Sequence, residues 1–278
     1  MENFSVDAYT PKEIAVRIEK ASVSKSLLDP VRVFVLALLA GAFIAFAAAF
    51  YTIIVYNSTM SPGLTRLLGG LAFCLGLVLV VVAGAELFTG NNLLVMAFVD
   101  NKITLKQLLL NWTIVFTGNF LGALGVVLLI HLSGHWLLDG GAVGAKALQI
   151  ANAKVNIGFV QAFARGVLCN ALVCLAIWLC FAGHSVTDKI LAILFPITAF
   201  VAMGFEHSVA NMYFIPAGIV AQYDAAIVNA AQAGDQMLDL THLNLAGLLA
   251  NLLPVTLGNL LGGSGFVGLV YWFIYSRE

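Results

Sequence analysis

The feature that most constrains this chain is a group of polar residues inside a long apolar stretch. The octet GFEHSVAN, residues 204–211, lies between two apolar runs, residues 190–203 and 212–221. Each run alone is short for a helix that must cross about 30 Å of hydrocarbon, which takes about 20 apolar residues. Joined, the runs predict one membrane span with a break at mid-depth. Because a lone charge at that depth costs about 2.5–3.5 kcal/mol, we expect these groups to face a protein-lined cavity, which suggests a transport site.

The composition is also that of a membrane protein. Of the 278 residues, 61% are hydrophobic and 10% are charged, whereas soluble domains are about 45–50% apolar and about 25% charged. The net charge of −1 gives no indication of a nucleic-acid partner. The cysteines lie inside apolar runs without CxxC spacing, so we interpret them as packing residues and expect neither a metal nor a cofactor.

A polar segment precedes the first apolar run. Thr10, Pro11 and Glu13 have the spacing of a helix start with an N-cap, a proline in the first turn and a capping box. Ile14 and Ile18 then share one face, which predicts a short amphipathic helix along the cytoplasmic surface. Two roles stay open for this helix, an anchor or a gate over a pore mouth.

The chain as a whole is predicted to be an all-α integral membrane protein with two segments. These are a cytoplasmic amphipathic segment, residues 1–30, and a six-span membrane channel domain, residues 31–278. The spans are expected at residues 31–56, 67–99, 108–132, 158–182, 190–221 and 245–275. The second and the fifth are interrupted by polar residues.

Lysine and arginine residues are unevenly divided between the two sides that this topology defines. Nine fall on the side of the termini and four on the other side. Because positive residues collect in cytoplasmic loops, both termini are predicted to lie in the cytoplasm.

The two halves of the membrane part repeat. The pattern E-x-x-x-x-N occurs at residues 86–91 and 206–211, an offset of 120, and G-N-x-L-G occurs at residues 118–122 and 258–262, an offset of 140. Three spans in each half is an odd number, so the copies must be inverted relative to each other. Paired breaks in corresponding positions of inverted halves predict a permeation site near the middle of the membrane.

The polar residues of the breaks suggest distinct roles. A small anion that enters an apolar constriction loses hydration, which helix N-termini and His207 can replace with hydrogen-bond donors. His207 is therefore expected either to donate a hydrogen bond or to pass a proton to the anion. Glu206 and Glu86 are expected to be structural, accepting hydrogen bonds from loop N–H groups. Four asparagines are expected to pair freed backbone groups, namely Asn91, Asn119, Asn211 and Asn259.

Several segments resemble the formate/nitrite transporter family. They are FEHSVANM at 205–212, AELFTGNN at 85–92, NALVCLAIWL at 170–179 and VTLGNLLGG at 255–263. The resemblance extends over about residues 25–276, and the residues around Phe205 and the run at 212–216 are most like those of the formate-conducting members. It implies an aquaporin-like protomer in a bacterial cytoplasmic membrane, five of which form a ring in contact with lipid.

The resemblance also implies roles for matching positions. His207 and Thr89 would meet at the middle of the pore, Asn170 would lie close to the path, and Lys154 would bias the outer part towards anions. The N-terminal helix would act as a gate. The remaining positions would narrow the pore, Phe73 and Phe200 on the outer side and Leu77, Leu87, Phe88 and Val173 on the inner side.

A channel for small monovalent anions, above all formate, is the favoured function. A nitrite or hydrosulfide channel and a strict proton–formate symporter are the alternatives, because they would use the same residues. An intramembrane hydrolase built on His207 and Ser208 is disfavoured, since adjacent side chains rarely align and the chain has neither G-x-S-x-G nor H-E-x-x-H. The Asn-Pro-Ala signature of water channels is absent from the sequence.

Overall fold

The computed structural model describes residues 8–233 and 238–277, which are almost entirely helical. The ends of the two predicted segments, residues 1–7 and 278, and residues 234–237 of the loop before the last span lie outside the described residues. In chain order the helices are α1 (Pro11–Ser26), α2 (Pro30–Val55), α3 (Pro62–Val78), α4 (Val95–Val99), α5 (Leu105–Leu132), α6 (Ala142–Val155), α7 (Phe159–Ala182), α8 (Val186–Ala202), α9 (Ser208–Ala221), α10 (Ala225–Gln232), α11 (Leu245–Leu260) and α12 (Val270–Tyr275). Distorted or tight helical turns join some of them, η1 (Leu79–Gly84), η2 (Gly90–Leu94), η3 (His135–Gly141) and η4 (Leu261–Leu269).

Within the described residues, five helical stretches are long and apolar enough to cross a membrane, and the bent pair α9 and α10 counts as a sixth if it is one span. The five are Pro30–Val55, Pro62–Gly84, Leu105–Leu132, Phe159–Ala182 and Leu245–Tyr275. The prediction of an all-α membrane protein is therefore confirmed. The residues expected as the fifth span, 190–221, are divided between α8 and α9.

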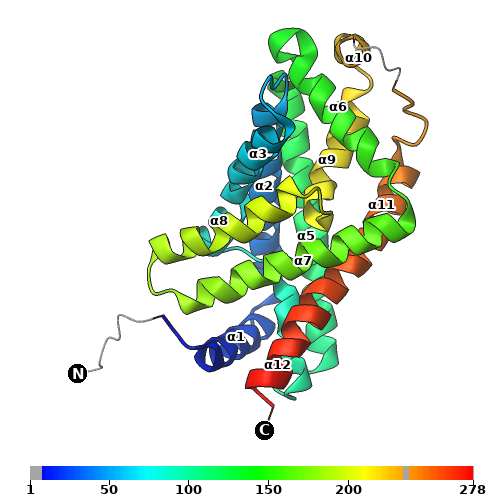
Figure 1. Cartoon of the computed structure of the whole chain (residues 1–278). Helices are drawn as coiled ribbons and strands as arrows, with labels where there is room; N and C mark the ends of the chain where they lie inside the picture. Colours follow the sequence, from blue (N-terminus) through cyan, green and yellow to red (C-terminus); the bar gives the residue numbers. More distant parts are fainter. Residues whose placement is uncertain (1–7, 234–237, 278) are drawn as a thin grey trace.

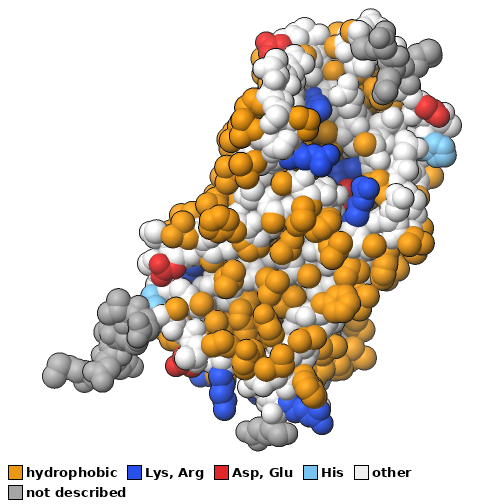
Figure 2. Space-filling model, in the orientation of Figure 1, with side chains coloured by type: hydrophobic (Ala, Val, Ile, Leu, Met, Phe, Trp, Pro, Cys, Tyr) orange, Lys and Arg blue, Asp and Glu red, His pale blue; other side chains and the backbone are white. Residues whose placement is uncertain are grey.

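The helices pack into one bundle with α1 across one end (Figure 1). Helix α2 packs against α3 and α5, α7 packs against α8 and α11, and α6 packs against α9. α1 lies beside α12 at one end of the molecule, and α10 lies beside α6 at the opposite end (Figure 1). Figure 2 shows a broad band of hydrophobic side chains over one face, with clusters of lysine and arginine above and below it.

The repeated G-N-x-L-G motif brings two pairs of helices into backbone contact. A Cβ atom on Gly122 would lie 2.0 Å from the carbonyl oxygen of Leu38, where α5 crosses α2. A Cβ atom on Gly262 would lie 2.1 Å from the carbonyl oxygen of Val167, beside α7. Only glycine fits such an approach, which is a common way to pack helices in membranes.

Two interruptions of the helices also have matching geometry. The stretch α3–η1 ends at Gly84, with φ of +83°, and α8 is followed by Gly204, with φ of +71°. The N–H of the next residue then bonds five residues back, from Ala85 to Val80 O at 2.9 Å and from Phe205 to Phe200 O at 3.0 Å. Both are glycine-terminated helix ends. Residues 85–89 and 204–207 follow in irregular conformation before η2 and α9 begin.

The N-terminal helix begins as the sequence predicts. The Thr10 side chain accepts the N–H of Glu13, and the Glu13 carboxylate accepts the N–H of Thr10, which completes the capping box. The apolar face packs on the protein itself, because Ile14 and Ile18 are buried in a cluster with residues of η2, α7 and η4. α1 therefore covers one end of the bundle with the face that was expected to lie along the membrane surface.

Candidate functional site

The two interruptions meet at His207 and Thr89. His207 is the N-cap residue of α9, and its Nδ1 accepts the backbone N–H of Ala210 at 3.1 Å. The Nε2 atom lies 2.9 Å from Oγ1 of Thr89. Both residues are buried. The contact therefore joins the second half of the chain to the first in the interior of the bundle.

The hydrogen bond from Ala210 determines which nitrogen of the neutral His207 ring carries the hydrogen. A backbone N–H can only donate, so Nδ1 must present its lone pair to Ala210, and the hydrogen of the neutral ring lies on Nε2. Nε2–H then donates to Thr89, whose hydroxyl hydrogen is free to donate in turn. A proton on Nδ1 would break this cap and add positive charge at the positive end of the α9 dipole. The geometry favours a neutral donor.

Aromatic rings surround this histidine on one side. The ring of Phe200 stacks on the His207 ring at a centroid distance of 5.9 Å. The ring of Phe73 meets Phe200 edge-on at 5.8 Å. All three side chains line the same cavity.

Two cavities approach the contact from opposite ends of the molecule. The α6-side cavity, of about 90 Å³, is lined by Lys154 of α6 together with His207 and the two phenylalanines. The α1-side cavity, of about 470 Å³, is lined by Lys25 of α1 and by residues of the first interruption, including Leu87. Because α1 and α6 lie towards opposite ends (Figure 1), the two cavities point towards opposite surfaces.

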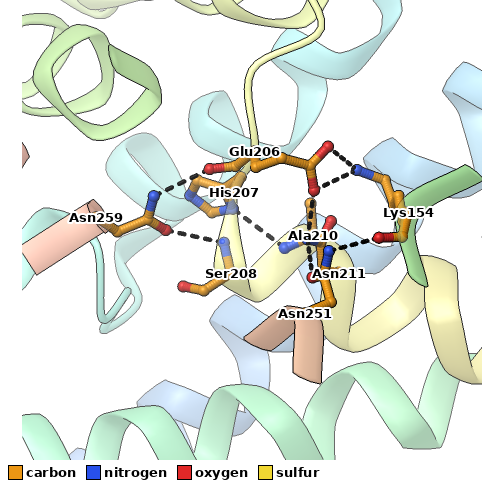
Figure 3. Close-up of polar contacts among 8 residues, drawn as sticks. All are labelled: Lys154, Glu206, His207, Ser208, Ala210, Asn211, Asn251 and Asn259. Carbon is orange, nitrogen blue, oxygen red and sulfur yellow. Dashed lines mark hydrogen bonds and ion pairs between the residues drawn. The ribbon is translucent and has the colours of Figure 1, made fainter. Parts of the chain in front are cut away.

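A closed group of charged and amide side chains lies beside the α6-side cavity (Figure 3). Lys154 Nζ donates to both oxygens of Glu206, at 2.8 and 3.0 Å. Asn211 Nδ2 donates to Glu206 Oε2 at 2.7 Å and to Asn251 Oδ1 at 2.7 Å, and Asn251 Nδ2 donates to Lys154 O at 2.8 Å. The Glu206 side chain is only 5% exposed, so the lysine supplies the counter-charge that a buried carboxylate needs.

A second group of the same residue types lies beside the α1-side cavity. Lys25 Nζ lies 3.1 Å from Glu86 Oε1 and donates to Asn91 Oδ1 at 2.8 Å. Asn91 Nδ2 donates to Glu86 Oε2 at 2.6 Å and to Asn111 Oδ1 at 2.9 Å. This lysine comes from α1, so the N-terminal helix contributes directly to the group.

The donors to both glutamates differ from those expected. Loop N–H groups were predicted, whereas the structure gives each carboxylate a lysine and an asparagine side chain. Asn91 and Asn211 thus bind carboxylates, and their expected pairing with backbone groups does not describe their side chains. The physical reason is that a charge buried among apolar helices requires an opposite charge.

Asn119 and Asn259 do pair freed backbone groups, as expected. Asn119 Nδ2 donates to Glu86 O at 2.9 Å, and its Oδ1 accepts the N–H of Phe88 at 2.9 Å. Asn259 Nδ2 donates to Glu206 O at 3.0 Å, and its Oδ1 accepts the N–H of Ser208 at 2.8 Å. Each asparagine therefore holds the irregular backbone of one interruption.

The Asn170 side chain donates to acceptors in both halves of the chain, one of which is the carbonyl oxygen of Thr89. Its Nδ2 lies 3.2 Å from Thr89 O, 2.7 Å from Asn259 O and 2.7 Å from Asn92 Oδ1. The side chain is fully buried. Asn170 thus positions the backbone of Thr89.

The other predicted constriction residues are buried side chains with different surroundings. Among them, Leu87 lines the α1-side cavity. Leu77, Phe88 and Val173 are buried but are not among the described residues that line either cavity. The ring of Phe88 lies edge-on to Phe116 at 5.1 Å, within the packing around α5.

Three residues of these groups were not predicted from the sequence as site residues, namely Lys25, Asn111 and Asn251. The spacing contains a usable pattern, because Asn111 and Asn251 each precede the asparagine of the G-N-x-L-G motif by eight residues. Aligning the halves on that motif finds this pair. No comparable pattern marks Lys25, because it lies in the polar segment outside the spans.

Comparison with known proteins places the chain among anion transporters. The family model described as formate/nitrite transporter matches residues 12–273. The chain belongs to the formate/nitrite transporter family. It is 43% identical to the formate channel FocA of Escherichia coli K12 over 98% of this chain and 96% of that protein. It is 40% identical to the formate channel FocA of Haemophilus influenzae over 96% of this chain and 95% of that protein.

A solved structure of this family has the same fold. It is described as a pentameric formate channel with formate bound and superposes with a TM-score of 0.82 at 42% identity. The match covers 89% of this chain and 98% of the other. The membrane-channel fold predicted from the sequence is therefore that of a known family of transporters, and a multi-pass membrane protein is confirmed.

Proposed function

We propose that this protein is a transmembrane channel for small monovalent anions, above all formate. The observation that carries the proposal is the 2.9 Å contact between His207 Nε2 and Thr89 Oγ1, with a cavity on each side of the interruptions that provide them. Full-length similarity to formate channels gives the substrate class.

Two broken spans in inverted halves of an aquaporin-like protomer account for this arrangement. The interruptions at residues 85–89 and 204–207 would divide the second and the fifth span. Support comes from contacts that occur twice, since Asn119 Nδ2 bonds Ala37 O and Asn259 Nδ2 bonds Gly166 O, both at 2.8 Å. Each acceptor lies twelve residues after the lysine of its group. Interrupted spans in inverted repeats place ion sites near the membrane midplane.

In this proposal the anion is stabilised by hydrogen-bond donors, and His207 does not transfer a proton to it. An anion arriving between Phe73 and Phe200 would replace Thr89 Oγ1 as the acceptor of the His207 Nε2–H, and the Thr89 hydroxyl would donate a second hydrogen bond to it. If Nε2 gave up its hydrogen, the ring would become an anion unless Nδ1 were protonated first, which the cap from Ala210 opposes. Of the two mechanisms open at the start, hydrogen-bond donation is the one that this geometry supports.

The two lysines provide the electrostatic bias. Lys154 and Lys25 each line one cavity together with the carboxylate that they pair with, Glu206 and Glu86, so each cavity wall presents an ammonium group held in place within an ion pair. Desolvating a small anion costs several kcal/mol, and fixed donors and cations offset this cost.

We also propose a membrane location, an oligomeric state and an orientation for the protein. It would lie in a bacterial cytoplasmic membrane as a homopentamer with one pore in each protomer, surrounded by lipid, with both termini in the cytoplasm. The described part of residues 1–30 would close over the cytoplasmic mouth, and residues 31–278 would form the channel domain. The relative with a pentameric structure and the excess of lysine and arginine near the termini support this setting.

Anion uptake into proteoliposomes tests the proposal. Formate, nitrite and hydrosulfide are compared from about pH 4 to about pH 8, the range around histidine titration. We expect formate flux above that of the other two anions, with less than one proton carried per anion. Equal movement of one proton with each formate would identify a symporter, and preference for another anion would correct the substrate.

A further inference from the structure

A third cavity lies on the flank of α1 and is not explained by the pathway described above. It has a volume of about 280 Å³ and lies between Tyr9 and Arg17 on one side and the turn joining α7 to α8 on the other. Val81, Cys180 and Phe181 line both this recess and the α1-side cavity. The two spaces are therefore neighbours, with those three apolar side chains between them.

The recess carries positive charge from two separate elements. Arg17 of α1 and Lys189 of α8 both line it. The guanidinium of Arg17 lies 3.9 Å from the centroid of the Tyr9 ring, which holds it in place. Arginine and lysine are the side chains that recognise carboxylates.

Two carboxylates lie next to residues that line the recess, Glu13 near Arg17 and Asp188 near His184, and each is hydrogen bonded at the start of a helix. Asp188 accepts the N–H groups of His184 and Ser185, both at 2.9 Å, at the start of α8. Glu13 is held by the capping box of α1. Neither is among the described residues that line the recess. The lysine and arginine that line the recess, Lys189 and Arg17, therefore have no carboxylate among the described lining residues.

The route along the axis is covered by α1, which is held at three places. Tyr9 N–H donates to Ala182 O at 3.0 Å, Lys102 pairs with Glu19, and Lys25 bonds the group around Glu86. Lifting α1 would break two ion pairs. The recess borders the α1-side cavity beside the helix, so an anion that passed the shared side chains Val81, Cys180 and Phe181 would leave all three attachments intact.

We infer that the recess is a lateral anion entrance to the α1-side cavity, at which Arg17 and Lys189 recruit a small carboxylate. The inference rests on the proposed channel function and adds the residues that feed it from the α1 side. Fixed positive charge at a pore mouth raises the local anion concentration and the rate of encounter, and this effect falls with ionic strength.

Formate flux from the α1 side into or out of oriented proteoliposomes tests the inference. Arg17→Gln and Lys189→Gln are each expected to lower the initial flux about threefold to tenfold at an ionic strength of about 20 mM. At about 300 mM the loss is expected to shrink below about twofold, because the Debye length falls. Arg17→Lys keeps the charge and is expected to retain most of the flux.

Lys20→Gln is the matched control, because Lys20 is an exposed residue of α1 that is not among those lining any of the three cavities. Thermal unfolding and size-exclusion profiles of each variant establish that it folds. If Arg17→Gln and Lys189→Gln behave like Lys20→Gln at both ionic strengths while the unchanged protein conducts formate, the lateral entrance is wrong and the channel function stands. If the unchanged protein moves no formate, the proposed function itself fails.

Discussion

At the residue scale, the two buried glutamates show what the pathway requires of its surroundings. The side chains of Glu86 and Glu206 are 7% and 5% exposed, and each is within hydrogen-bond distance of a lysine. A buried ion pair adds little net stability, but removing one partner leaves an uncompensated charge that costs about 3–5 kcal/mol. The lysines therefore stabilise the interruptions, apart from the part in anion conduction proposed for them.

A double-mutant comparison separates these two roles for Lys154. Lys154→Gln leaves Glu206 buried without its counter-charge, so we expect destabilisation of about 3–5 kcal/mol in thermal or denaturant unfolding. The double variant Lys154→Gln with Glu206→Gln is expected to recover most of that stability, while its anion flux stays low. Recovery of flux together with stability would show that the charge of Lys154 has no part in conduction.

At the element scale, the interruptions depend on how two helices end. Gly84 and Gly204 have positive φ, and a Cβ atom at either position would meet no heavy atom within 4 Å. The requirement for glycine is therefore one of backbone conformation and not of space. The two ends share this geometry although neither glycine belongs to the repeated E-x-x-x-x-N pattern.

Alanine substitutions test this requirement. Gly84→Ala and Gly204→Ala are each expected to destabilise the protein by about 1–2 kcal/mol, the cost of a left-handed residue with a Cβ. Gly63→Ala is the control, because Gly63 also has open space around its Cβ position and lies in the first turn of α3 without a positive φ. Equal unfolding temperatures for all three variants would contradict the role given to the two glycines.

Helix α1 is attached to the rest of the bundle by a cluster of charged side chains around Lys102. Lys102 bonds Asp100 and the buried Glu19 of α1, and Trp272 Nε1 donates to Asp100. The hydrogen bond from Lys102, followed by that from Trp272, lowers the pKa of Asp100 below its usual range. Because the folded-state pKa is depressed, this stabilisation is fully present above the unfolded value of about 3.9 and is lost as the pH falls through the folded value.

Hydrogen exchange in α1 measures this attachment. Lys102→Met is expected to lower the protection of α1 amides about tenfold to a hundredfold at neutral pH, since hydrogen bonds to charged groups contribute about 1.5–3 kcal/mol. In the unchanged protein the protection should stay constant down to about pH 4 and fall below it. Lys106→Met, at an exposed position in α5, is the control. Unchanged protection in Lys102→Met would contradict the attachment.

At the scale of the whole molecule, long apolar runs predicted the helical membrane fold. The spans at 108–132, 158–182 and 245–275 agree closely with Leu105–Leu132, Phe159–Ala182 and Leu245–Tyr275. Long apolar runs are reliable because the membrane leaves the backbone few alternatives to helix. The capping box at Thr10 was also predicted correctly from the sequence, because all of its interactions are local.

Interactions between segments that are distant in the sequence could not be predicted from local sequence patterns. The bond between His207 and Thr89 depends on how two halves pack, and Thr89 was singled out only through the resemblance to a family. Lys25 reaches Glu86 across the end of the bundle, which no local spacing encodes. The partner of a buried charge is decided by tertiary structure, so sequence alone predicted the need for partners more reliably than their identity.

The measurement that tests the central claim most directly is formate flux through His207→Phe in proteoliposomes, with Thr89→Val alongside. A hydrogen bond to a charged partner contributes about 1.5–3 kcal/mol, so each loss is expected to slow formate about tenfold to a hundredfold while the protein remains folded. Because the imidazole acts as a neutral donor, its removal should leave the dependence of flux on pH as it is in the unchanged protein. Unchanged formate flux in His207→Phe would contradict a passage built around this imidazole.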